Sequence, residues 1–124
     1  MRVVDTSVWI EWLADTRFGR LLGPELPSRQ QCLVPTIVQL ELAKWLHRTA
    51  GSHAVRQMMR YTRQCVVLPL DTPTALRAAN LHRQYGLALA DAVIYATALR
   101  HNATLLTCDA HFALLPAVIY RSKL

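Results

Sequence analysis

Short apolar runs alternate with longer amphipathic stretches along this chain, which predicts strands separated by helices. Five runs have the length and composition of strands: 2–5, 32–35, 65–70, 103–107 and 117–121. Apolar residues recur at helical spacing over 6–14, 36–48, 53–64, 72–85 and 89–101. The stretch 15–31 is expected to hold a short helix followed by a loop. Strands joined through helices predict an α/β fold, a three-layer α/β/α sandwich around a mostly parallel sheet.

Four helix boundaries carry capping signals in the sequence. Thr36 stands three positions before Gln39, which is the spacing of a capping box at the start of the helix 36–48. Asp71 precedes a first-turn proline and is expected to cap a helix that ends at Gly86. Asn102 is expected to end the helix 89–101 in the left-handed conformation.

Length and composition favour one compact domain over residues 1–124. The chain is 52% hydrophobic and 18% charged, a surplus of apolar residues that suggests a buried sheet or a partner interface. The three tryptophans are compatible with the core or with an interface: Trp9, Trp12 and Trp45. Charges interrupt every apolar stretch before it reaches membrane-spanning length, and only two valines separate Arg2 from Asp5. We therefore expect a soluble, cytoplasmic protein.

The charge balance is basic and favours a polyanionic partner. Lys and Arg total 14 against 8 Asp and Glu, a net charge of +6. Arg56, Arg60 and Arg63 recur at helical spacing and form a stripe, opposite the side that carries Val55 and Met59. The stripe is interpreted either as a solvated face or as a contact for RNA or a protein partner.

Cysteine usage gives no evidence for a metal-binding framework. The three cysteines are odd in number and widely spaced, which fits a reducing compartment. Cys108 and His111 form half of a zinc signature, but no second pair completes it. Buried, inert thiols are the favoured interpretation.

Four carboxylates occupy positions that suggest chemistry. Asp91 lies within the otherwise apolar run LALADAVIYATA, where an unpaired ionised carboxylate would be costly. Asp5 and Asp109 follow strand-like runs, and ligands bind beyond the carboxyl ends of strands in open parallel sheets. Glu41 lies one turn into the helix 36–48.

Each of these acids also has an ordinary explanation. Asp5 and Asp91 can compensate helix dipoles, Asp109 can cap a turn, and Glu41 can pair with a lysine or arginine on its own helix. The candidate partners of Glu41 are Lys44 and Arg48. Three further acids are expected to be solvated and to need no chemistry: Glu11, Asp15 and Glu25.

Considered together, the four acids favour a cation. Carboxylates a few ångströms apart repel one another and raise each other's pKa values unless a cation lies between them. A set of oxygen ligands selects Mg²⁺ or Mn²⁺, and such ions bind phosphodiesters and activate water.

The order of the motifs resembles that of PIN-domain ribonucleases, and among these the VapC toxins of bacterial toxin–antitoxin pairs. The motifs are DTSVWIEWL, VQLELA, LALADAVIYATA and LLTCDAHF, and the resemblance spans nearly the whole chain. It implies a compact α/β/α sandwich in which Asp5, Glu41, Asp91 and Asp109 form a catalytic acidic quartet that binds Mg²⁺ or Mn²⁺. Ser7 and Thr107 fit the same motifs as supporting groups, although turn capping explains them equally well.

The resemblance also implies a substrate and partners. The expected function is a toxin that cleaves RNA, commonly tRNA or a ribosomal RNA loop, and so inhibits translation. A VapB-type antitoxin would neutralise it, and the toxin would be a homodimer. Many relatives carry a further acidic or polar residue just after the fourth acid, whereas Ala110 and His111 follow Asp109 here. A second metal ion is therefore less expected than the first.

Other functions compete with this interpretation. A non-catalytic RNA-binding PIN module would be expected to have lost acids, and a DNA-directed nuclease would use the same ones. A phosphate-accepting receiver domain is disfavoured because Asp5 stands alone where receivers carry an acidic pair. A haloacid-dehalogenase-type phosphatase is disfavoured because Ser7 occupies the position of its second aspartate.

Overall fold

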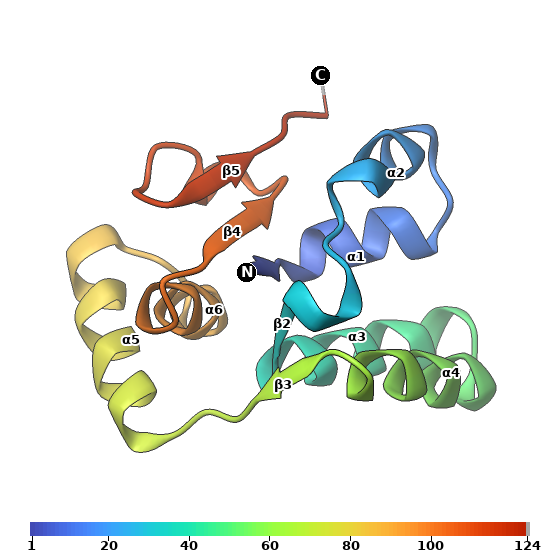
Figure 1. Ribbon diagram of the computed structural model, residues 1–124, viewed down its shortest axis with the longest axis horizontal. Helices are drawn as coiled ribbons and strands as arrows, with labels where there is room; N and C mark the ends of the chain where they lie inside the picture. Colours follow the sequence, from blue (N-terminus) through green and yellow to red (C-terminus); the bar gives the residue numbers. More distant parts are fainter. Residues whose placement is uncertain (124) are drawn as a thin grey trace.

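A five-stranded, wholly parallel sheet forms the centre of the protein, in the order β3-β2-β1-β4-β5 (Figure 1). The computed structural model describes residues 1–123. The strands are β1 (Arg2–Val4), β2 (Cys32–Pro35), β3 (Val66–Leu68), β4 (Thr104–Thr107) and β5 (Val118–Tyr120). Every strand pairing is parallel, because each strand returns to the sheet through helices.

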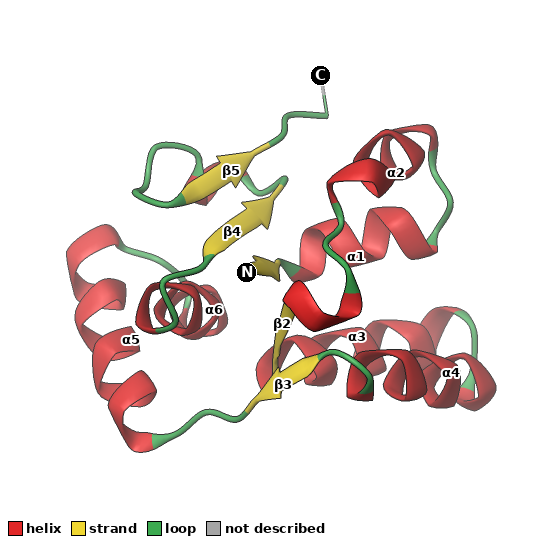
Figure 2. Ribbon diagram, viewed as in Figure 1, coloured by secondary structure: helices red, strands yellow, loops and turns green. Residues whose placement is uncertain are grey.

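Helices cover both faces of this sheet. The α-helices are α1 (Thr6–Leu13), α2 (Arg17–Leu22), α3 (Thr36–Thr49), α4 (Ser52–Arg63), α5 (Thr72–Tyr85) and α6 (Leu89–Arg100). Short 3₁₀ helices span Gly23–Glu25, Arg29–Gln31 and Ala110–Phe112. In Figure 2, α5 and α6 lie on one side of the strands and α1 to α4 on the other. The predicted three-layer α/β/α sandwich is confirmed.

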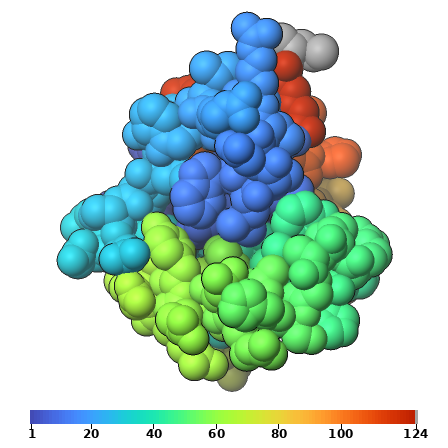
Figure 3. Space-filling model, turned by 90° about the vertical axis from the view of Figure 1, so that its right-hand side faces the viewer, coloured from blue at the N-terminus to red at the C-terminus, as the bar shows by residue number. Residues whose placement is uncertain are grey.

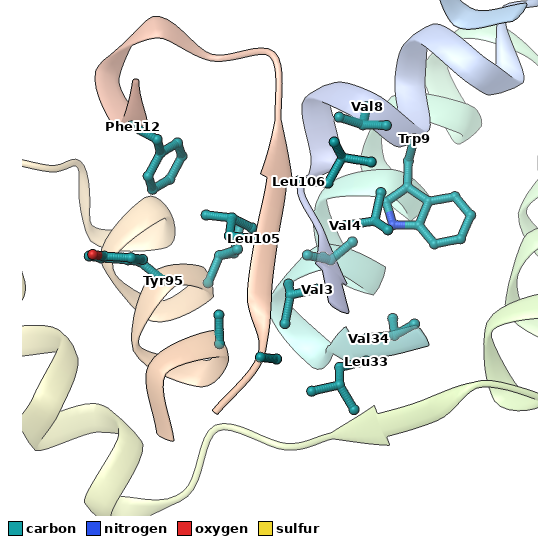
Figure 4. Packing of buried hydrophobic residues seen from close by; sticks show 14 of the residues in the cluster. Val3, Val4, Val8, Trp9, Leu33, Val34, Tyr95, Leu105, Leu106 and Phe112 are labelled. Carbon is teal, nitrogen blue, oxygen red and sulfur yellow. The ribbon is translucent and has the colours of Figure 1, made fainter. Parts of the chain in front are cut away.

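The central strand β1 and its neighbour β4 place buried side chains on both faces of the sheet. Val3 and Val4 of β1 and Leu105 and Leu106 of β4 are completely inaccessible to solvent. Consecutive side chains of a strand point to opposite faces, so each strand supplies both halves of the core. Figure 4 shows Leu105 facing the helix that carries Tyr95, whereas Leu106 faces Val8 of α1. This packing fixes the strand ends, where the acidic side chains lie.

Three predicted helix boundaries are confirmed by their geometry. The Asp71 carboxylate accepts a hydrogen bond from the Thr74 backbone N–H at 3.0 Å, as expected of an N-cap. Gly86 ends α5 with φ of 68°, and Asn102 follows α6 with φ of 51°. Both residues therefore end their helices in the left-handed conformation.

The predicted capping box at Thr36 is wrong. Helix α3 already includes Thr36, and the N-cap position is Pro35, which offers no side-chain cap. The Gln39 amide instead donates to the Thr62 hydroxyl of α4 at 3.1 Å. The Gln39 side chain, which the local pattern assigned to the cap, therefore makes a tertiary contact with α4 instead.

Two of the three acids that were expected to be solvated are held by the C-terminal segment. Glu11 is only 9% exposed, accepts a hydrogen bond from Thr16 at 2.7 Å and forms an ion pair with Lys123. Glu25 pairs with Arg121 at 2.7 Å. The third, Asp15, is exposed as expected. The basic residues that pair with Glu11 and Glu25 lie about a hundred positions further along the chain, so local sequence patterns do not reveal these contacts.

Strand β3 is shorter and less buried than its sequence suggested. The apolar run 65–70 predicted a buried strand, but only Val66–Leu68 is extended, and its residues are half-buried. The strand lies at the edge of the sheet, and Pro69 has no N–H to continue the ladder. Among the described residues, no helix combines the length and apolarity needed to cross a membrane.

Gly19 allows α2 to approach α1 closely, which gives a test of this packing. A Cβ at Gly19 would lie 2.0 Å from the Glu11 carbonyl oxygen, whereas a Cβ at Gly23 meets nothing within 4 Å. We expect Gly19→Ala to lower the free energy of unfolding by about 1–3 kcal/mol or more, through overpacking. Gly23→Ala is the matched control and should raise it by about 0.4–1 kcal/mol. Urea denaturation followed by circular dichroism measures both, and equal effects would contradict the close packing.

Candidate active site

Asp5 lies at the carboxyl end of β1, directly before α1, and is buried there. Its side chain is 3% exposed. The Oδ2 atom accepts hydrogen bonds from the Ser7 hydroxyl at 2.6 Å and from the Thr107 hydroxyl at 2.8 Å. Thr107 reaches Asp5 because β4 is the parallel neighbour of β1. Burial raises the pKa of Asp5, and the two hydrogen bonds oppose that increase.

Asp109 lies just beyond the end of β4. Its backbone N–H donates to the Thr107 hydroxyl at 3.0 Å, so Thr107 links Asp5 to Asp109. Its carboxylate caps the following 3₁₀ helix by accepting from the His111 backbone N–H at 2.9 Å. The turn-capping interpretation of Asp109 is therefore correct, and it leaves the carboxylate at the strand edge beside Asp5.

Glu41 reaches the same edge from α3. It accepts a hydrogen bond from the Thr6 hydroxyl at 2.6 Å, and Thr6 is the residue next to Asp5. Within residues 1–123, Glu41 forms no ion pair with Lys44 or Arg48, although helical spacing allowed one. The carboxylate thus turns toward α1 and the strand ends rather than along its own helix.

Asp91 lies in the first turn of α6, where part of the carboxylate is buried. Burial, followed by repulsion from Asp5, Asp109 and Glu41, raises the pKa of Asp91 to about 6. All four predicted acids therefore interact electrostatically, although they come from β1, α3, α6 and the loop after β4. Their shared position is the carboxyl edge of the sheet, where open α/β folds bind ligands.

The acidic cluster lacks a neutralising arginine or lysine. Within residues 1–123, no Lys or Arg forms an ion pair with any of the four acids. The His111 imidazole, whose Nδ1 lies 2.9 Å from the Asp109 carboxylate, would neutralise charge there only when it is protonated. Repulsion from Asp109 and Glu41 also contributes to the raised pKa of Asp5. Holding these negative charges together therefore costs free energy. A bound cation would reduce the repulsion between them.

Comparison with known proteins identifies the family. Residues 2–118 match the family model of the PIN domain. The chain belongs to the PIN-domain family. No curated protein sequence gives a match.

Solved structures share the fold of this PIN domain at low sequence identity. A toxin–antitoxin complex from Klebsiella pneumoniae has a TM-score of 0.83 at 23% identity and covers 96% of each chain. The toxin VapC20 from Mycobacterium tuberculosis, described as cleaving the sarcin-ricin loop, has a TM-score of 0.76 at 18% identity, covering 98% of this chain and 99% of its own. FitAcB from Neisseria gonorrhoeae has a TM-score of 0.74 at 22% identity, covering 98% and 97%.

His111 is a residue of this PIN-domain site that sequence reasoning missed. One ligand atom from each of Asp91, Asp109 and His111 lies within 4.8 Å of the others. The sequence paired His111 with Cys108 as half of a zinc signature, whereas the structure places its ring against Asp109. The available signal was its position two residues after Asp109, within the reach of a single tight turn.

The arginine stripe of α4 does not lie opposite all the apolar side chains of that helix. Met58 and Thr62 are buried, but Val55 and Met59 are only partly covered. They line a cleft of about 400 Å³ together with Arg56, Arg60 and Arg63. The stripe therefore borders a shallow apolar surface, and none of the three arginines forms an ion pair within residues 1–123.

The raised pKa of Asp91 predicts a pH-dependent stability. Folding raises this pKa from 3.8 to about 6, so the folded state binds the proton more tightly than the unfolded chain. The protonated carboxyl therefore favours folding at low pH, and that contribution is lost as pH rises through about 6. In metal-free protein, Asp91→Asn should raise the free energy of unfolding by about 1–2 kcal/mol above pH ~7, and hardly at all below pH ~4.

Chemical denaturation at several pH values, in the presence of a chelator, measures this difference. Asp15→Asn is the control, because it removes the same charge from an exposed position. A gain for Asp91→Asn that does not change with pH would show that ionisation of Asp91 is not responsible.

Proposed function

We propose that this PIN domain is an endoribonuclease that depends on Mg²⁺ or Mn²⁺ and acts as the VapC-type toxin of a bacterial toxin–antitoxin pair. The observation that supports this most strongly is the convergence of four carboxylates at the carboxyl edge of a PIN-domain sheet. VapC20, whose fold is similar, is described as cleaving the sarcin-ricin loop. The proposed target here is tRNA or a ribosomal RNA loop in the cytoplasm, and its cleavage would inhibit translation.

The residues of the cluster fit a hard divalent cation. Asp5, Glu41, Asp91 and Asp109 are the proposed ligands and catalytic residues, because carboxylate oxygens are the donors that Mg²⁺ and Mn²⁺ prefer. Burial of Asp5 and the raised pKa of Asp91 indicate that their negative charge is poorly compensated by the protein itself. When bound, the cation would activate water and stabilise the leaving oxygen of a phosphodiester.

The protein would orient the ligands through neighbouring hydroxyl groups. Ser7 and Thr107 both donate to Oδ2 of Asp5, which leaves Oδ1 without a hydrogen bond within residues 1–123. Thr6 holds Glu41 in the same way. These contacts fix the carboxylates before a ligand arrives, which reduces the reorganisation that binding requires.

The partners proposed are an antitoxin and a second copy of the chain. An apolar cavity of about 350 Å³ lies where α1, α3 and α4 meet, lined by side chains that include Trp12, Leu46, Met58 and Tyr61. In Figure 3, α1 is seen directly above the α3–α4 pair on this side of the molecule. An apolar segment of a VapB-type antitoxin is the proposed occupant, consistent with the toxin–antitoxin complex from Klebsiella pneumoniae. The homodimer is proposed from the resemblance to VapC toxins.

Metal-dependent cleavage of RNA tests the enzymatic proposal. Purified protein is incubated with total bacterial RNA in Mg²⁺ or Mn²⁺, and new RNA ends are mapped by sequencing. We expect discrete ends that disappear with EDTA and fall at least a hundredfold in Asp91→Asn, consistent with losses of roughly 10²–10³ for removed electrostatic groups. The sequence around the ends would identify the target.

Two controls make the result decisive. Asp15→Asn should cleave as the parent protein does, because Asp15 is exposed and lies outside the cluster. Titration of the metal by calorimetry should give binding heat for the parent and much less for Asp91→Asn. Metal binding without new RNA ends would point to a DNA substrate, whereas neither binding nor cleavage would favour a non-catalytic RNA-binding module.

The arginine stripe is the proposed contact for the RNA backbone or a partner. Replacing Arg56, Arg60 and Arg63 by alanine should reduce the slope of log affinity against log salt by about 2, since each phosphate contact on a single strand contributes roughly 0.7. Fluorescence anisotropy at several salt concentrations measures the slope. An unchanged slope would remove the stripe from the RNA-binding surface.

A further inference from the structure

The positive charge of the protein is concentrated in one part of the chain. Residues 42–70, which include most of α3, all of α4 and β3, contain five Lys and Arg and no Asp or Glu. The rest of the chain carries nine Lys and Arg against eight Asp and Glu. The net charge of +6 therefore belongs almost entirely to the α3–α4 region, which lies beside the acidic cluster at the start of α3.

A groove connects this basic region to the acidic cluster. It has a volume of about 370 Å³, within the roughly 300–1,000 Å³ of small-ligand sites. One end of the groove lies at the acidic cluster. It is formed by Glu41, which belongs to the cluster, by Thr6, which follows Asp5, and by Ala90, which precedes Asp91. The rest is lined by side chains of α1 and α3: Ile10, Ile37, Leu40, Lys44, Trp45 and Arg48.

The groove combines an apolar surface with unpaired cations. Lys44 and Arg48 are exposed, and neither forms an ion pair or a hydrogen bond within residues 1–123. They follow Glu41 on the same face of α3, at steps of three and four residues. Trp45 is partly exposed in the same groove. Cations beside an aromatic ring are the features with which proteins bind single-stranded nucleic acid.

We infer that this groove binds the single strand of RNA that flanks the scissile phosphate, with Lys44 and Arg48 on the backbone and Trp45 under a base. This inference rests on the proposed nuclease function and adds a path for the strand. Lys44 and Arg48 are about 6 Å apart along the helix axis, given a rise of 1.5 Å per residue. That separation matches successive phosphates on an extended strand. The strand would then enter the acidic cluster past Glu41, the only acid in the groove.

Binding without cleavage tests the inference separately from catalysis. A fluorescent single-stranded RNA of mixed sequence is titrated in EDTA against the full-length protein. Lys44→Gln with Arg48→Gln should reduce the salt slope by about 1.4, two contacts at roughly 0.7 each. Trp45→Leu should weaken binding roughly tenfold or more through the loss of stacking. Arg77→Gln with Arg83→Gln is the matched control on α5, in the other helical layer, and should leave the slope unchanged.

Photo-crosslinking gives a readout that does not depend on the variants. RNA carrying 4-thiouridine should crosslink to Trp45 or its neighbours on α3, and excess unlabelled RNA should abolish the product. Crosslinks elsewhere, with an unchanged salt slope, would overturn the inference. If an acidic peptide or a second copy of the chain protects the groove while RNA does not, the groove is a protein contact and the inference is wrong.

The outcomes also separate the groove from the proposed function. Wild-type cleavage with unaltered binding by the double variant would reject the groove and retain the nuclease. Altered binding without cleavage of any RNA by the wild-type protein would support the groove and reject the nuclease. Equal effects on single-stranded DNA and RNA would support the inference, because backbone and stacking contacts do not depend on the 2′-hydroxyl group.

Discussion

Repulsion among clustered carboxylates is the constraint on which the acidic edge of this protein depends. Asp5 is almost completely buried, and its negative charge is opposed by desolvation and by Asp109 and Glu41. Two hydroxyl groups compensate part of that cost, and no arginine or lysine within residues 1–123 does so by an ion pair. A fold tolerates such a site when the rest of its core is well packed, as it is here around the completely buried Val3 and Val4 of β1 and Leu105 and Leu106 of β4.

The sequence allowed much of the fold and the location of the acids to be predicted. Alternating apolar runs indicated the five strands, and the acids at the ends of β1 and β4 indicated a shared edge if those strands were neighbours. That condition is met, since Arg2 pairs with Thr104. Local capping signals at Asp71, Gly86 and Asn102 were reliable because they depend only on nearby backbone. The catalytic and ligand roles of the acids stay predictions.

The predictions that were wrong concern side chains whose partners are distant in sequence. Gln39 bonds to Thr62 instead of completing a capping box, and Glu11 is buried beneath Lys123 instead of being solvated. His111 is a different case, because its partner Asp109 lies only two residues away. Helical periodicity reports which face a residue occupies, but it does not report which element covers that face. The groove along α3 was invisible because α1 forms its other wall.

The order of the strands determines when the acidic edge can exist. β1 is the first strand in the chain and lies in the middle of the sheet, but its partner β4 begins 102 residues later. Contacts between such distant segments slow folding, because a long loop must close before they form. During synthesis, Asp5 cannot meet Thr107 or Asp109 until β4 and the residues that follow it have left the ribosome. The acidic edge is therefore absent while only the segment from β1 to α6 has been made.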